Sequence, residues 1–270
     1  MLDRNGLTMR VWHEFKEDDV PGEAAKIAYY AFLALPPSLL VLFALTGFFG
    51  GPDAAAWITA NLEAALPNSA SELIRNFVDE VVGDEAPGPF SIGLLIAIWA
   101  SSNIFMALGD SLDTAYDVTT TRSWIKRRAI SVGVMLIFVV LFLGGSAILL
   151  AGPELAAAIG LGNAAQAIWN ILIWPLAFVL IVTAFWTVYY ILPDRDQSSK
   201  KVILAKAAAA SALVWVLGTA IFRLYISNFA SYSETYGFLG AVIVLLLWMY
   251  VTGIVVLAGG ELASELDVRG

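Results

Sequence analysis

The sequence predicts an all-α, polytopic membrane protein with six transmembrane helices and both termini in the cytoplasm. Hydrophobic residues make up 59% of its 270 residues and charged residues only 14%, with a mean hydropathy of +0.78. Soluble domains are less apolar and carry about a quarter charged residues. The apolar residues form long uninterrupted stretches, and the basic residues gather in alternate connections between them. These observations together favour a bilayer protein over a soluble one.

Six stretches are long enough to be transmembrane helices, since roughly 20 apolar residues cross about 30 Å of hydrocarbon. The second is the least apolar, because Asn103 and Asp110 interrupt it. The first is not a secretory signal peptide: it is too long, it follows a mostly polar N-terminal segment, and it lacks a small-residue cleavage site. The predicted spans are about 27–49, 91–112, 130–151, 169–192, 203–226 and 237–259.

The distribution of Lys and Arg sets the predicted orientation. Of the fifteen basic residues, only Arg75 and Arg223 lie on the side opposite the N-terminus. Because cytoplasmic connections are enriched in Lys and Arg, the N-terminal segment 1–26 and the C-terminus are predicted to be cytoplasmic. The whole chain, 1–270, is predicted to be a single membrane domain.

The first outer loop, 50–90, is long and acidic, but its pattern predicts helices. Apolar residues recur at helical spacing between Leu73 and Val82, and Ser69 and Glu72 have the spacing of a capping box. These amphipathic helices would lie on the outer membrane interface or act as a lid over an outward cavity. A smaller apolar stripe predicts an interfacial helix in the N-terminal segment: Leu7, Val11, Trp12 and Phe15.

Polar residues follow one face of the second span. Charged groups at membrane depth are costly, so this face is expected to line a helix–helix contact or a water-filled cavity that opens to the cytoplasm. The basic residues 126–128 could pair with its lower end, although we favour their interpretation as a positive-inside anchor. The face comprises Asn103, Met106, Asp110, Asp113 and Asp117.

Other candidate binding residues lie near both ends of the spans. Arg223 is expected to pair with Glu234 in the outer turn between spans five and six, or to contact an anionic group. That turn is rich in hydrogen-bonding groups, including Tyr236. Towards the inner side, Tyr29 and Tyr30 precede Pro36-Pro37, which is expected to break or kink span one. The candidate substrate-binding residues are therefore Asn103, Asp110, Asp113, Arg223, Glu234, Tyr236, Tyr29 and Tyr30.

Several stretches of the sequence have a pattern that is characteristic of one family: 24–30 with Pro36-Pro37, 99–117, 124–128, 190–193 and 225–261. They resemble the YihY/BrkB family of bacterial inner-membrane proteins, once labelled ribonuclease BN. The resemblance extends from about Ala24 to Glu265, with Asp113 in place of the commoner asparagine. It implies six helices with cytoplasmic termini, a multi-pass location in the bacterial inner membrane, and a role in envelope lipid or export biology.

Composition limits the chemistry that the chain can perform. It has no cysteine and a single histidine, His13, so thiolate chemistry and a histidine acid–base pair are excluded. The net charge of −8 disfavours nucleic-acid binding. No carboxylate cluster has metal-site spacing with histidine partners, and no nucleotide-binding motif is present. We therefore expect no catalytic residues, no metal and no cofactor, and the ribonuclease label is not supported.

Three functional hypotheses follow. The first is a transporter or flippase for an amphipathic, anionic, lipid-like molecule, with membrane lipids as partners. The second is a non-catalytic scaffold that binds envelope proteins through loop 50–90. The third is a metal-dependent membrane enzyme that acts on lipid headgroups through inner carboxylates, Asp113 or Asp117.

Overall fold

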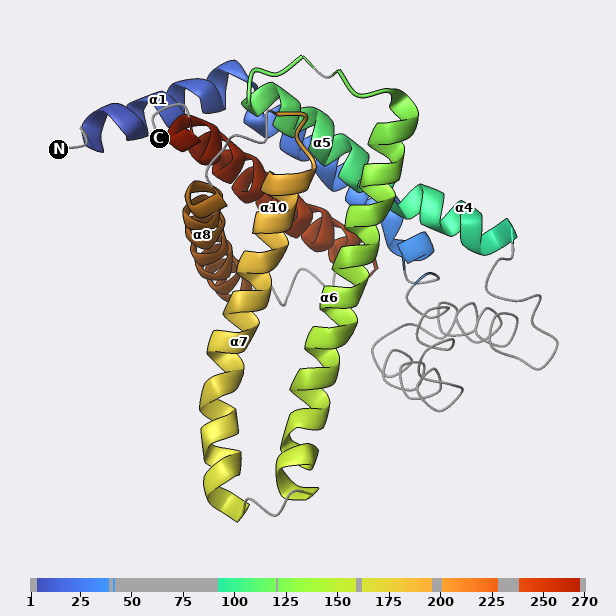
Figure 1. The fold of residues 1–270 in the computed structure, drawn as a ribbon, viewed down its shortest axis with the longest axis vertical. Coiled ribbons are helices and arrows are strands. Elements are labelled where there is room, and N and C mark those ends of the chain that lie inside the picture. The colour runs from blue at the N-terminus through green and yellow to red at the C-terminus, as the bar shows by residue number, and fades with distance from the viewer. Residues whose placement is uncertain are drawn as a thin grey trace. The chain divides into compact units, whose positions relative to one another are not determined.

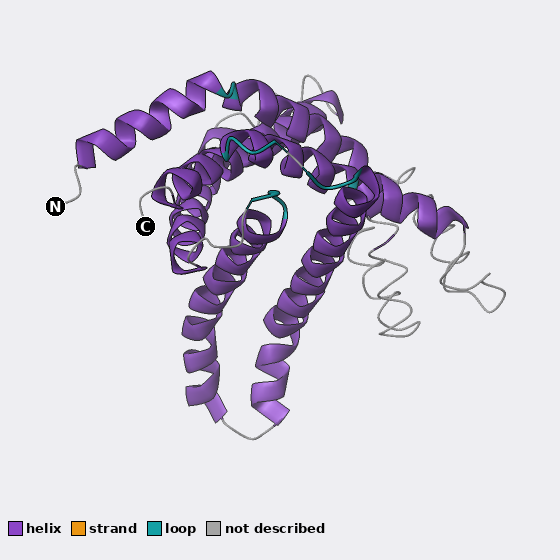
Figure 2. Cartoon of the chain, turned by 45° about the horizontal axis from the view of Figure 1, so that its top comes forward, coloured by secondary structure: helices purple, strands orange, loops and turns teal. Residues whose placement is uncertain are grey.

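The computed structural model describes residues 4–38, 41, 92–119, 121–158, 162–195, 201–227 and 238–267. These residues form helices joined by short connections, and no strand occurs among them (Figure 2). The all-α prediction is therefore confirmed for the described part of the chain. Besides residues 20–38, the helices are α1 (Arg4–Glu17), α4 (Ile92–Ser101), α5 (Asn103–Ala115), α6 (Trp124–Ala158), α7 (Gly162–Ile191), α8 (Lys201–Ser227) and α10 (Phe238–Asp267).

The chain divides into two compact units, Leu33–Ile104 and Met1–Phe32 with Phe105–Gly270. Within the smaller unit, the helix of the predicted second span is interrupted at Ser102. The hydroxyl groups of Ser101 and Ser102 donate to the carbonyl oxygens of Ala97 and Trp99, at 2.7 and 2.8 Å. Such side-chain bonds to the preceding turn compete with the regular helical pattern.

The larger unit is a set of long helices packed in pairs. α10 packs against α8, α8 against α7, and α7 against α6, while α1 lies against α10. α6 and α7 run side by side (Figure 1). The segment 20–32 also contacts α10, because a Cβ on Gly253 would lie 3.1 Å from the carbonyl oxygen of Ala24. Small residues allow this close approach of two helix backbones.

Five helical segments of the described chain are long and apolar enough to cross a membrane: Leu94–Ala115, Trp124–Gly145, Ile171–Ile191, Lys201–Ile226 and Val242–Asp267. Less than half of each is buried within the protein, and large apolar side chains such as Val140, Trp174 and Ile221 are exposed. A soluble protein rarely exposes so much apolar surface, whereas lipid solvates it well. The helices therefore describe a multi-pass membrane protein.

The first predicted span is described only in part. Residues 20–38 are helical, so the helix continues through Pro36 and Pro37 and is not broken at either proline as far as residue 38. The outer loop 50–90, with its predicted interfacial helices, lies outside the described residues, so the sixth span and the orientation stay predictions. The predicted N-terminal helix is present as α1, and its Met9 and Trp12 are exposed.

Candidate functional site

The polar face of α5 contacts basic and polar residues at the start of α6. Asp110 forms an ion pair with Arg127, and the Ser131 hydroxyl donates to the sulfur of Met106 at 3.9 Å. Both partners of the ion pair are partly buried, with 41% of the Asp110 side chain and 24% of the Arg127 side chain exposed. The preference for a pure positive-inside anchor at residues 126–128 was therefore wrong for Arg127. Lys126 is exposed.

Asp194 follows α7 and is held by residues that precede α6. Its carboxylate forms an ion pair with Arg122, with 2.9 Å between Nε and Oδ1. It also accepts hydrogen bonds from the backbone N–H groups of Thr121 and Arg122, at 2.6 and 3.0 Å. Burial raises the pKa of Asp194, but these hydrogen bonds and the arginine outweigh it, so its pKa lies below the usual value.

The same arginine caps the C-terminal end of α7. Its guanidinium donates to the carbonyl oxygens of Ile191, Leu192 and Pro193, at 3.3, 3.0 and 3.1 Å. The last carbonyls of a helix have no partners within the helix and carry partial negative charge, so a cation is stabilising there. Arg122 is only 13% exposed and makes all these hydrogen bonds, so its role is to hold the C-terminal end of helix α7 in place.

Asp113 connects α5 to the Arg122–Asp194 ion pair at the end of α7. Its Oδ1 accepts a hydrogen bond from the backbone N–H of Asp194 at 2.6 Å, and the residue is 8% exposed. α5 ends two residues later, at Ala115, and Asp117 beyond that end adopts a left-handed conformation with φ of 51°. The α5 carboxylates thus line a contact between helices, which is one of the two environments that the sequence allowed.

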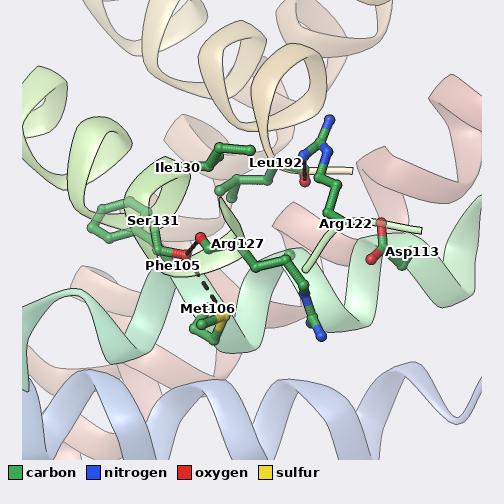
Figure 3. Close-up of a pocket in the computed structure, with 9 residues that line it drawn as sticks. Phe105, Met106, Asp113, Arg122, Arg127, Ile130, Ser131 and Leu192 are labelled. Carbon is green, nitrogen blue, oxygen red and sulfur yellow. Dashed lines mark hydrogen bonds between the residues drawn. The ribbon is translucent and has the colours of Figure 1, made fainter. Parts of the chain in front are cut away.

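A small cavity lies between these groups (Figure 3). It has room for about one water molecule, which is far too little for a lipid headgroup. Any larger substrate would therefore require α5 and α6 to separate at this point. The lining residues are Phe105, Met106, Gly109, Asp113, Arg122, Arg127, Ile130, Ser131 and Leu192.

A second polar cluster lies where α1 meets α10. Glu261 of α10 is 1% exposed, and its carboxyl group lies within hydrogen-bonding reach of that of Asp18, which follows α1. Glu14 and Asp117 add further negative charge. Burial, followed by the like charges of Asp117 and Glu17, raises the pKa of Asp18 above its usual value, although the hydrogen bond to Glu261 opposes the rise.

α7, α8 and α10 meet at a buried polar contact. The Tyr189 hydroxyl is fully buried and lies 2.9 Å from both the Ser211 hydroxyl and the carbonyl oxygen of Val256. Gly259 makes this contact possible, because a Cβ at that position would overlap Tyr189 and Ser211. The contact holds the three helices at short range.

The structure brings together only some of the predicted substrate-binding residues. Asp110 and Asp113 both contact the α6–α7 end, and Asn103 begins α5. Tyr29 and Tyr30 are exposed and in edge-to-face contact with each other, with ring centroids 5.7 Å apart. Arg223 is exposed on α8. Glu234 and Tyr236 lie outside the described residues.

Glu261, Asp18 and Arg122 are interior polar residues that the sequence did not single out as such. Glu261 follows directly after Gly259 and Gly260, at the end of the last predicted span. A Cβ on Gly260 would lie 2.5 Å from Leu112, so α5 passes close to the turn that carries Glu261. A glutamate directly after two glycines in an apolar helix was the available signal for close packing around a charge.

One histidine-containing group has the geometry of possible metal ligands, which the sequence analysis did not anticipate. Ligand atoms of His13, Glu14 and Glu17 all lie within 4.8 Å of one another on α1. His13 and Glu17 are exposed and contact each other at 3.1 Å. Such exposed acidic groups are common without any ion, so this group carries no functional assignment.

Comparison with known protein families shows to which family the chain belongs. The family model described as virulence factor BrkB matches residues 11–270. The chain belongs to the virulence factor BrkB family. The resemblance seen in the sequence is therefore confirmed. No solved structure matches the chain.

Three relatives of this BrkB family chain match over most of their length. The ribonuclease-like protein YfkH of Bacillus subtilis is 29% identical, over 92% of this chain and 90% of the relative. A UPF0761 membrane protein of Actinobacillus pleuropneumoniae is 27% identical, over 97% and 92%. Another from Pseudoalteromonas atlantica is 27% identical, over 94% and 83%. The names and the apolar helices agree that this BrkB family chain is a membrane protein.

Proposed function

We propose that this protein is a transporter or flippase for an amphipathic, anionic, lipid-like molecule of the bacterial inner membrane. The observation that carries the proposal is the ion pair between Asp110 of α5 and Arg127 in the first turn of α6, since both helices contain segments long and apolar enough to cross a membrane. Charged pairs at membrane depth are costly and commonly mark substrate or ion pathways. A scaffold that acts through its outer loop would have no need of such a pair.

The ion pair also suggests how a headgroup could enter. A guanidinium matches the geometry of phosphate as well as that of carboxylate, so an anionic headgroup can replace Asp110 as the partner of Arg127. That exchange would free α5 from α6 beside the small cavity, while Arg122 and Asp194 keep the end of α7 in place. Arg223, exposed at the predicted outer end of α8, offers a second cationic contact.

The ribonuclease-like name of YfkH does not enter this proposal. The chain has one histidine, His13, which is exposed, so a histidine pair is not available for acid–base cleavage of RNA. The negative net charge also works against binding of a polyanion. Both considerations support transport over nuclease activity.

The test is a flipping assay in proteoliposomes that contain a tail-labelled phosphatidylglycerol, with a tail-labelled phosphatidylcholine as the zwitterionic comparison. Arg127→Ala is expected to slow movement of the anionic lipid by roughly tenfold, which corresponds to about 1.4 kcal/mol. Lys126→Ala is the matched control, because it removes the same charge from the exposed neighbouring position. Its rate should stay near that of the wild type.

A double charge reversal separates the role of Arg127 in lipid selectivity from its role in folding. Asp110→Arg combined with Arg127→Asp restores opposite charges between α5 and α6, so it should recover folding without recovering the anionic selectivity that Arg127 provides. Wild-type protein that moves neither lipid faster than protein-free liposomes would overturn the proposed function. Equal rates for Arg127→Ala and the wild type would overturn the assignment of the site.

A further inference from the structure

The carboxyl groups of Asp18 and Glu261 stand apart from the ion pairs described above. Asp18 lies in the turn after α1, and Glu261 lies near the end of α10, so the contact joins two elements distant in sequence. The side chains of Asp18 and Glu261 lie within reach of a hydrogen bond to each other. Ionised carboxylates carry only acceptor atoms, so a hydrogen bond between two carboxyl groups requires a proton on one of them.

The burial of Glu261 also requires that a positive charge neutralise its carboxylate. The residue is 1% exposed, and its Oε1 atom is buried without a hydrogen-bond partner among the described residues. An isolated carboxylate in such a position is strongly destabilised unless a cation or a proton neutralises it. The unpartnered oxygen therefore indicates that a positive species belongs at this position.

No basic residue of the described chain supplies that charge. Arg10 pairs with Glu265 at 2.9 Å, and Arg195 pairs with Asp267 at 3.7 Å. The other ionisable groups that act on Glu261 are acidic, Glu14 from α1 and Asp117 after α5. The Tyr116 hydroxyl is buried nearby, and burial raises its pKa, so it is neutral and adds no charge.

We propose that Asp18 and Glu261 form a proton-binding site in which the two carboxyl groups share one proton. Asp18 is half-buried and reaches the solution, whereas Glu261 is enclosed by α10 and its neighbours. The proton enters from water at Asp18 and is held between the two side chains. Loss of that proton leaves two adjacent negative charges, which repel and weaken the contact between α1 and α10.

This site goes beyond the proposed transport function, because proton binding can be measured whether or not a lipid is moved. It does not use the Asp110–Arg127 pair. If transport proves correct, the site offers a means by which proton binding could be linked to movement of α1 against α10. If the flipping assay shows no transport, proton binding at Asp18 and Glu261 can still be measured.

The test is infrared spectroscopy of the full chain in phosphatidylcholine bilayers, recorded at neutral pH in the absence of divalent cations. The carbonyl stretching band of a protonated carboxylic acid is expected in the wild type. Glu261→Gln should remove band intensity equivalent to one acid per chain, because glutamine keeps the shape without the proton. Glu17→Gln is the matched control on α1: this side chain is 64% exposed and should leave the band unchanged.

A second variant keeps the proposal testable if Glu261→Gln folds poorly. Asp18→Asn replaces the half-buried partner, and it should shift the frequency of the remaining Glu261 band and the pH at which it disappears. A difference spectrum between wild type and Glu261→Gln without an acid band would overturn the proposal. Loss of the wild-type band on adding Mg²⁺ or Ca²⁺ at constant pH would also overturn it, because the site would then hold a metal cation.

Discussion

Arg122, which precedes α6, and Asp194, which follows α7, form an ion pair of 2.9 Å that joins the ends of two long helices. Asp113 of α5 accepts the backbone N–H of the same aspartate. Three helices are therefore fixed at one end by a few side chains. Stability at this end should depend strongly on the pair.

Replacement of Arg122 should destabilise the protein. Arg122→Ala leaves the Asp194 carboxylate without its cation and exposes the last carbonyls of α7, at an expected cost of roughly 3–5 kcal/mol. Arg122→Lys keeps the charge without the planar fork and should recover only part of the loss. The measurement is the thermal unfolding midpoint in detergent. Lys126→Ala, on an exposed neighbour, should change stability by about 0.5 kcal/mol or less.

The contribution of Asp194 should depend on pH in a defined direction. Its folded-state pKa is lowered, so the ion pair contributes stability above the unfolded pKa of about 3.9 and loses it as the pH falls through the folded value. The stability difference between wild type and Asp194→Asn should therefore be full at neutral pH and shrink in acid. A difference that stays constant down to acidic pH would contradict the assignment.

The shared proton of Asp18 and Glu261 predicts the opposite pH trend. The folded-state pKa of Asp18 is raised, so its contribution is complete below the unfolded value of about 3.9 and is lost as the pH rises. Thermal midpoints of the wild type should decline towards alkaline pH. Glu261→Gln should show a smaller decline, because it removes the like charge that repels ionised Asp18. Equal slopes for the two proteins would count against the pair.

The close approach of α10 to α7 and α8 can be tested at Gly259. Gly259→Ala adds a Cβ that would overlap Tyr189 and Ser211, so it should destabilise by about 1–3 kcal/mol. Gly218→Ala in α8 is the control, since no atom lies within 4 Å of its added Cβ. The control should be neutral or stabilising by up to about 1 kcal/mol. Chemical unfolding in mixed detergent gives both values.

The Tyr189 hydroxyl should contribute through its hydrogen bonds. Tyr189→Phe keeps the ring but removes the group that bridges Ser211 and Val256, and the expected cost is about 1 kcal/mol. Tyr190→Phe is the neighbouring control, because this ring stacks on Trp186 at 4.7 Å and keeps that contact without its hydroxyl. Similar losses of stability in both variants would show that the hydrogen bonds of the Tyr189 hydroxyl make no specific contribution.

The sequence alone determined the class of this protein. Long apolar stretches are visible in one dimension because a bilayer solvates each helix separately, and the apolar content correctly predicted a helical membrane protein. The resemblance of several stretches to the BrkB family was also confirmed. Periodicity also placed Asp110 and Asp113 on the polar face of one helix. The number of spans, their orientation and the outer loop remain sequence predictions, since residues 50–90 lie outside the described structure.

Only the tertiary structure decided which charges meet. Arg127, interpreted as a membrane anchor, pairs with Asp110, and Arg122 closes the end of α7, because the connections bring these helix ends together. Asp18 and Glu261 are separated by most of the chain, so no local pattern relates them. Pairing between distant residues depends on helix packing, and in this chain that packing is set by small residues and buried hydrogen bonds that hydropathy does not record.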